Sequence, residues 1–231
     1  MGGAPFRNPS IRLEFAPMKP NFEGWTIAVA GLWNVRIFTP GWVAKNAFDT
    51  NVIQTEVRFG APAPSVIEPV SLRYRFGSLI LIPAYDRLII GMTSVADGVL
   101  QQAESVALRI VKSLPHTPIS AFGVNFSFSE EEPSAEAIRL FKLSDASLIS
   151  YEILQTEITR RLKLESSVLN LKQTFDHKVL RVDFNFHYDT PTGAEQVSAR
   201  LPGSVMKSQT LAYDIIKAYN FDTEEKDADA N

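Results

Sequence analysis

Alternation of hydrophobic and polar residues, which is typical of half-buried strands, recurs along most of the chain. Segment 25–37 also alternates, and because Gly31 lies inside it we expect one long strand or a hairpin bent at Gly31, with a helix as the competing interpretation. The clearest strands are predicted at residues 11–15, 53–59, 72–76, 79–82, 88–92, 122–128, 168–175 and 179–188.

A different spacing, with apolar residues three and four positions apart, predicts an amphipathic helix that begins at Asp97 and ends before Pro115. Thr39 followed by Pro40 is a helix-start signal and predicts a short helix through residue 48. Further helices are expected at 130–142, where acidic residues suit a first turn, and at 204–220. Segment 147–164 fits a helix, but its second half fits a strand equally well.

This order of elements indicates an α+β fold with a mainly antiparallel sheet and two principal amphipathic helices. Strand, turn, strand and helix occur twice, with turns at 85–87 and 175–177, which suggests two related meander-plus-helix modules; coincidence is the alternative. The predicted segments are a strand-rich, tryptophan-containing part at 1–60, a first module at 61–130, a second module at 131–221 and a disordered acidic tail at 222–231.

Composition excludes several classes of protein. The 231 residues include no cysteine, which removes disulfide frameworks, thiolate metal sites and cysteine nucleophiles, and 45% apolar residues argue against disorder. The net charge of -3 divides into -4 for the acidic tail and +1 for the rest, so no general attraction to nucleic acid is expected. Neither a signal sequence nor an apolar stretch of about 18 residues is present, and we expect a cytoplasmic protein.

Aromatic residues crowd the first segment, where Trp25, Trp33 and Trp42 lie within 18 residues of one another. Tryptophan is enriched at interface hot spots, so these three residues are the candidate partner-binding site. The alternative is that they pack the N-terminal segment against the sheet.

Basic side chains offer a candidate nucleic-acid site, since Lys and Arg supply the phosphate contacts in such complexes. They occur in two separate places in the sequence, and the alternative is a solvated polar face. The candidates are Arg73, Arg75, Arg160, Arg161 and Lys163.

Histidine is scarce, and the strongest polar row in the sequence contains one of the three. Along strand 179–188, Asp183, His187 and Asp189 project from one face and are candidate metal ligands or acid–base groups. The alternative is the solvent face of an antiparallel sheet, which is polar in any case.

The chain contains neither a nucleophile elbow nor a phosphate-binding loop, and no cofactor is expected. Aromatic clustering and several strands that would lie at sheet edges favour a non-catalytic binding or assembly subunit that acts through protein–protein contacts. The expected partner is another protein or a second copy of the chain. A nucleic-acid-associated protein is the first alternative, and a metal-dependent hydrolase is the second.

Overall fold

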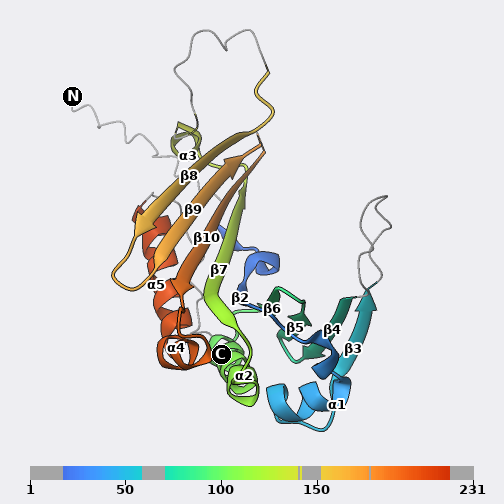
Figure 1. Cartoon of the computed structure of the whole chain (residues 1–231). Helices are drawn as coiled ribbons and strands as arrows, with labels where there is room; N and C mark the ends of the chain where they lie inside the picture. Colours follow the sequence, from blue (N-terminus) through green and yellow to red (C-terminus); the bar gives the residue numbers. More distant parts are fainter. Residues whose placement is uncertain (1–17, 59–70, 140, 142–151, 177, 219–231) are drawn as a thin grey trace, which may run out of the picture.

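A ten-stranded antiparallel sheet with a layer of helices on one face forms the fold, which confirms the α+β prediction (Figure 1). The computed structural model describes residues 18–58, 71–139, 141, 152–176 and 178–218, so the predictions for 11–15, 60–69 and 222–231 lie outside the described residues. The strands are β1 (Lys19–Pro20), β2 (Thr26–Gly31), β3 (Gln54–Arg58), β4 (Ser71–Phe76), β5 (Leu79–Pro83), β6 (Arg87–Met92), β7 (Ile119–Glu131), β8 (Thr156–Lys163), β9 (Val168–Phe175) and β10 (Val179–Asp189).

The strand order has two matching halves that meet between β2 and β7. One half runs outward as β2-β6-β5-β4-β3 and the other as β7-β10-β9-β8, while the short β1 pairs with β7 beside β2. In each half the first strand lies next to the last one in sequence, and a meander leads outward from there. These halves do not coincide with the predicted modules, because β7, which the sequence prediction assigns to the module 61–130, lies with β10, β9 and β8.

The helices form a single layer that packs on one face of the sheet. After β6, helix α2 crosses over β2 to reach β7, and it contacts β6 and β2 on the way. Within the described residues, no helix is long and apolar enough to cross a membrane. The helices are α1 (Pro40–Val43) continued by the π-helical η3 (Ala44–Phe48), α2 (Val99–Ser113), α3 (Ala135–Arg139), α4 (Ala194–Arg200) and α5 (Ser204–Ala218), with 3-10 turns η1 (Phe22–Gly24) and η2 (Val35–Ile37).

The core lies between this helical layer and the facing side of the sheet. Alternate residues of each strand point into it, and burying a large apolar side chain contributes about 1.5–3 kcal/mol relative to leaving it exposed. One row of such residues crosses seven strands in register and is formed by Leu169, Phe186, Val124, Ile27, Ile90, Leu81 and Tyr74.

Aromatic contacts attach the α1 region to this core. Trp33 and Trp42 both pack against the Phe38 ring, with ring centroids 6.1 and 5.2 Å away. The Tyr74 hydroxyl donates a hydrogen bond to the carbonyl of Phe38, and burial raises the pKa of Tyr74. The helix start predicted at Thr39 is confirmed, because its hydroxyl accepts a hydrogen bond from the Trp42 amide at 3.3 Å.

Three boundaries differ from the sequence predictions. The alternating segment 25–37 is a strand only to Gly31, after which the chain leaves the sheet and forms η2. Gly98, in a left-handed conformation with φ 79°, precedes α2 in place of Asp97, and no side chain caps that end. Segment 147–164 resolves as the strand β8 over its last part.

The helix predicted at 130–142 was placed too early. Glu130 and Glu131 still belong to β7, because Leu180 and Val179 of β10 pair with them and extend the ladder. Only the short α3 forms beyond this point. The cross-strand pairing, which the acidic sequence does not reveal, outweighs the preference of acidic residues for a helix start.

Candidate functional site on the uncovered face of the sheet

The described helices all pack on one face of the sheet, and we call the opposite side the uncovered face. Alternate residues of every strand point there, interleaved with the core residues. The side chains on this face that the structure describes are mostly half-buried, from Asn170 in β9 to Ile80 in β5. The uncovered face is therefore a continuous surface of partly accessible side chains on the described strands.

An uninterrupted row of hydrogen-bonded polar side chains, here called the amide row, crosses four strands of the uncovered face. Nδ2 of Asn170 donates to Oδ1 of Asn185 at 2.8 Å, and Nδ2 of Asn185 donates to Oδ1 of Asn125 at 2.6 Å. Nδ2 of Asn125 then donates to Oγ1 of Thr26 at 2.9 Å. Each amide uses one of its two N–H groups in this chain of bonds, so the row retains donor capacity for a ligand.

A glycine provides the space for the middle of this row. Gly123 of β7 lies beside Asn185, and a Cβ atom at position 123 would come within 3.2 Å of Nδ2 of Asn185. Contacts this short force the neighbour to shift by a few tenths of an ångström. The absence of a side chain at Gly123 therefore lets the Asn185 amide lie flat against the sheet, where it reaches both of its partners.

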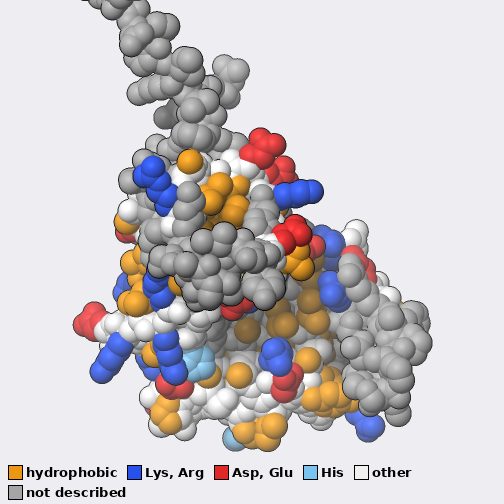
Figure 2. Space-filling view, turned by 90° about the horizontal axis from the view of Figure 1, so that it is seen from above, with side chains coloured by type: hydrophobic (Ala, Val, Ile, Leu, Met, Phe, Trp, Pro, Cys, Tyr) orange, Lys and Arg blue, Asp and Glu red, His pale blue; other side chains and the backbone are white. Residues whose placement is uncertain are grey.

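The uncovered face becomes apolar towards β5 and β6. Ile80, Ile82 and Ile89, here called the isoleucine patch, are half-buried there, with Ile82 and Ile89 directly opposite each other in the ladder. They belong neither to the core cluster nor to the described side chains that pack against it. Figure 2, a view from above, shows hydrophobic side chains on the floor of a hollow in this part of the molecule, with acidic and basic side chains around it.

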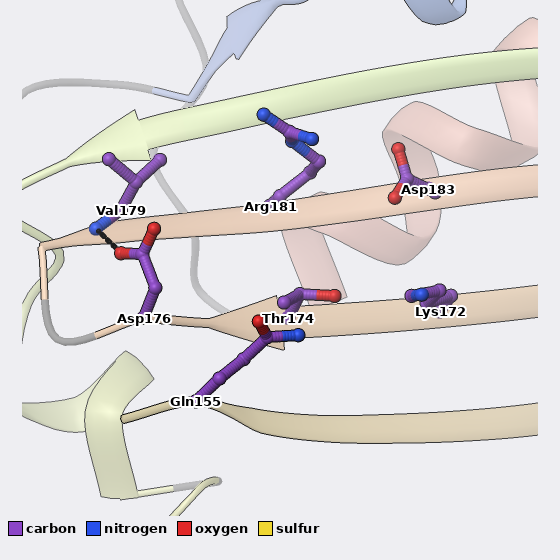
Figure 3. A pocket seen from close by; sticks show the side chains of 7 residues that line it. All are labelled: Gln155, Lys172, Thr174, Asp176, Val179, Arg181 and Asp183. Carbon is purple, nitrogen blue, oxygen red and sulfur yellow. Dashed lines mark hydrogen bonds between the residues drawn. The ribbon is translucent and has the colours of Figure 1, made fainter. Parts of the chain in front are cut away.

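A small polar pocket lies at the other end of the face, beside the turn between β9 and β10. Its volume is about 250 Å³, and Figure 3 shows the side chains that line it, from both strands and from Gln155. Asp176 in the turn accepts hydrogen bonds from the backbone amides of Val179 at 2.8 Å and of Lys178 at 3.2 Å. These hydrogen bonds hold the pKa of Asp176 below its ordinary value, so the carboxylate stays charged.

Acidic and basic side chains are interspersed on the part of the uncovered face formed by β8, β9 and β10, here called the polar half. Nζ of Lys172 lies 2.7 Å from a carboxylate oxygen of Glu157, and this hydrogen bond lowers the pKa of Glu157. Four basic and three acidic side chains project from β8, β9 and β10 onto the uncovered face. They are Arg161, Lys163, Lys172 and Arg181 against Glu157, Asp183 and Asp189.

The predicted metal site does not form within the described residues. Nε2 of His187 lies 3.0 Å from Oδ1 of Asp189, so those two side chains do meet. Asp183, however, is four residues from His187 on an extended strand, which separates them by about 13 Å. No group of three or more His, Asp or Glu side chains that could share a metal ion occurs in the part of the chain that the structure describes.

The basic residues predicted to contact nucleic acid do not gather in one place. Arg73 and Arg75 lie on β4, whereas Arg160, Arg161 and Lys163 lie on β8, seven positions away in the strand order, or about 34 Å along the sheet. Arg160 also points to the helix side of the sheet, where it hydrogen-bonds the buried Gln173. Arg75 is paired with Glu56 at 3.3 Å.

The three tryptophans pack inside the molecule. Trp25 and Trp33 are 0% and 2% exposed, and Trp42 is half-buried against the core. Nε1 of Trp25 donates to the Ser127 carbonyl at 2.9 Å, while Nε1 of Trp33 donates to the Val29 carbonyl at 3.0 Å. With ring and indole N–H both engaged, Trp25 and Trp33 serve the packing role that was the alternative in the sequence.

The sequence alone does not connect Asn185 with Asn125, Asn170 and Thr26. One signal was present, because asparagine is depleted in strands and three predicted strands carry one in their interior. Which of these residues lie opposite each other depends on strand order and register, which no local pattern specifies.

Comparison with known proteins adds no family to this description. No protein-family model matches the sequence, and no curated protein matches it at a significant level. The functional argument therefore depends on the geometry of the uncovered face.

Proposed function

We propose that this protein is a non-catalytic binding or assembly subunit that uses the uncovered face of its sheet for protein–protein contacts. The observation that carries the proposal is the amide row, a line of pre-oriented hydrogen-bonding groups next to the apolar isoleucine patch. The proposal places this function in the cytoplasm, since a chain without cysteine needs no oxidising compartment.

The size of the feature suits a macromolecule. The amide row extends over four adjacent strands and the isoleucine patch over the next two, so together they span about 25 Å across the sheet. A stable protein interface covers about 800 Å² on each partner, so the row and the patch would form its centre and neighbouring side chains of the uncovered face the rest. The pocket at the β9–β10 turn is smaller than the clefts of about 300–1,000 Å³ that hold drug-sized ligands.

Its composition also suits a protein partner. Protein interfaces combine an apolar centre with hydrogen-bonding groups, and here isoleucines lie beside amides in the same face. Hydrogen bonds within the amide row fix the side chains before binding, which lowers the entropy cost of association.

The charge pattern favours protein over nucleic acid. Nucleic-acid affinity comes largely from Lys and Arg that neutralise phosphates. Here Lys172 already pairs with Glu157, and the acidic Asp183 lies among the basic side chains of the polar half.

The test is the size of the complex that the full-length protein forms in a lysate of its native host. We expect the tagged wild type to sediment as a discrete complex that survives nuclease treatment. Ile82→Ser combined with Ile89→Ser should remove the complex while leaving the far-UV spectrum unchanged. Met206→Ser, an apolar-to-serine change on α5, should leave it intact, because α5 lies on the covered side.

Three results would reject the proposal. The first is loss of the complex on nuclease treatment, which would favour the nucleic-acid alternative. The second is a complex that both isoleucine substitutions leave unaltered. The third is a wild type that sediments in the lysate at the mass of the purified protein.

A further inference from the structure

The strand β8 forms a free edge of the sheet. Among the described residues its only strand neighbour is β9, and its eight residues pair with β9 without a register shift. It contains neither proline nor glycine. Within the part of the chain that the structure describes, no strand pairs with the other side of its backbone, and such an edge is the template used in pairing with an additional strand.

The side chains of β8 suit one particular partner, a second copy of β8. On the uncovered face the strand carries Glu157 near one end and Arg161 and Lys163 at the other. Antiparallel pairing of two copies about Thr159 places each Glu157 opposite Arg161 of the other copy and diagonal to Lys163. We propose that the protein forms a two-fold dimer in which two β8 strands pair antiparallel about Thr159 and join the two sheets.

Other arrangements of the same strands are less favourable. Parallel pairing in register would put Glu157 opposite Glu157 and Arg161 opposite Arg161. Antiparallel pairing about Arg160 would put the two copies of Arg160 opposite each other. Like charges directly opposite destabilise a ladder, so the charge pattern favours antiparallel pairing about Thr159 over both of these arrangements.

The opposite edge of the sheet, β3, is a poorer candidate. It has five residues compared with eight in β8, and antiparallel pairing about its centre would place Glu56 opposite Glu56. A dimer through β8 alone also closes on itself, since both copies use the same strand.

The other side of β8 adds apolar contact. Ile158 and Leu162 point to the helix side, and Leu162 is still 39% exposed, so the helical layer does not fully cover this edge. In the register about Thr159, Ile158 of one copy lies diagonal to Leu162 of the other. Pairing would bury apolar surface that the monomer leaves in contact with water.

The dimer would enlarge the binding surface. A two-fold axis between antiparallel strands is perpendicular to the sheet, so both uncovered faces point to the same side. This consequence rests on the proposed function, because it makes the dimer a bivalent form of the same binding face.

Mass measurement on the purified full-length chain is the first test. Sedimentation at tens of micromolar should give twice the chain mass of 25.7 kDa for the wild type. Glu157→Lys and Arg161→Glu should each halve the measured mass to that of a monomer, because each substitution places like charges opposite each other twice. The matched controls Glu195→Lys and Lys207→Glu, both on exposed helical positions, should remain dimeric.

A charge-swap experiment then tests the register. An equal mixture of the Glu157→Lys and Arg161→Glu proteins should regain the dimer mass, since every opposing pair is again of opposite sign. The double variant E157K/R161E should also be dimeric. Recovery in both cases shows that the single variants are folded.

The absence of cysteine in the chain allows a second readout that requires no charge change. Thr159→Cys places one thiol on the two-fold axis, and mild oxidation should convert most of this variant to a disulfide-linked dimer. Arg181→Cys, on the same face but two strands from the edge, should remain monomeric in a denaturing gel. Cross-linking of both variants to the same extent would indicate random collision and contradict the proposal.

A wild type that stays monomeric at these concentrations overturns the dimer, as does a dimer that the charge reversals leave intact. Either result leaves the proposed binding of another protein by the uncovered face standing, because the complex size in the native lysate tests that proposal separately. Conversely, a confirmed β8 dimer that forms no complex in the lysate rejects only the proposed function.

Discussion

Two rows of residues, one position apart on each strand, show how differently the two faces of this sheet are used. On the covered face, the row through Phe186 and Val124 is fully buried and apolar. On the uncovered face, the row through Asn185 and Asn125 is hydrogen-bonded, polar and half-buried. Each strand contributes to both rows, so a shift of one residue in register would exchange them.

The two faces of the sheet contribute to the stability of the molecule in different ways. Apolar side chains below the sheet supply the hydrophobic stabilisation, which is non-directional and depends on buried area. The amides above it contribute directional bonds worth about 1 kcal/mol each, which is little for folding. Under the proposed function, the same aligned amides are the groups that a partner protein would contact.

The largest expected loss of stability comes from removing a buried ring on the covered face of the sheet. Phe186→Ala removes a ring that is 1% exposed and should lower the free energy of unfolding by about 3–5 kcal/mol, from lost burial and a residual cavity. His187→Ala, the next residue and on the uncovered face, should cost less than about 1 kcal/mol. Urea titration of both variants measures the contrast, and equal losses would show that the upper face is as important for stability as the core.

Breaking the amide row should have an intermediate effect on stability and a large one on binding. Asn185→Leu removes the central amide and leaves Asn170 without its acceptor and Asn125 without its donor. We expect a loss of about 1–2 kcal/mol in urea unfolding, because half-buried polar groups lose partners. The complex in native lysate should disappear. Asn170→Ala, at the end of the row, should cost about half as much, and a larger cost than for Asn185→Leu would contradict the ordering.

Two glycines on the uncovered face give a sharper comparison. At Gly123 an added Cβ would meet Nδ2 of Asn185 at 3.2 Å, whereas at Gly91 the nearest atoms lie at 3.7 and 3.8 Å, an ordinary contact. Gly91→Ala should therefore be neutral or stabilising by roughly 0.5 kcal/mol, because alanine restricts the unfolded chain. Gly123→Ala should be destabilising by on the order of 1 kcal/mol. Thermal unfolding of both variants measures the difference. Identical unfolding midpoints for the two variants would mean that Gly123 does not position the Asn185 amide.

The smallest effect concerns pH. The backbone hydrogen bonds from Val179 and Lys178 depress the pKa of Asp176 in the folded state. Its contribution to stability is therefore present above the ordinary aspartate value of 3.8 and is lost as the pH falls through the lower folded value. Asp176→Asn keeps an acceptor oxygen but not this titration, so its stability should fall less steeply with acid than that of the wild type. Parallel acid-unfolding curves would contradict this.

Local sequence patterns predicted the individual elements well where a single periodicity dominated. The meander β4-β5-β6, the strands β9 and β10, and helix α2 follow from such patterns. Errors arose where a distant strand decided the outcome, as at Glu130, which pairs with Leu180 fifty residues away. Helix α4 was missed because it has only seven residues, too few for a clear stripe.

The sequence alone indicated the residue types of the candidate site but not their arrangement across strands. Asn185 lies in the polar row along one strand, but the amide row runs across strands, from Asn170 through Asn125 to Thr26. That alignment requires β2 to lie between β6 and β7, a placement set by the crossover of α2 rather than by any segment alone. Strand order is the non-local information that a single sequence does not carry.

The most direct test of the uncovered face as a protein-binding surface is site-specific photocross-linking in the native host. A photoreactive residue is placed at position 82 in the isoleucine patch, at 181 in the polar half, or at 207 on the covered side. We predict the same discrete, nuclease-resistant protein adduct from positions 82 and 181, and none from position 207. Adducts of equal yield from all three positions, or none from 82 and 181, would contradict the account.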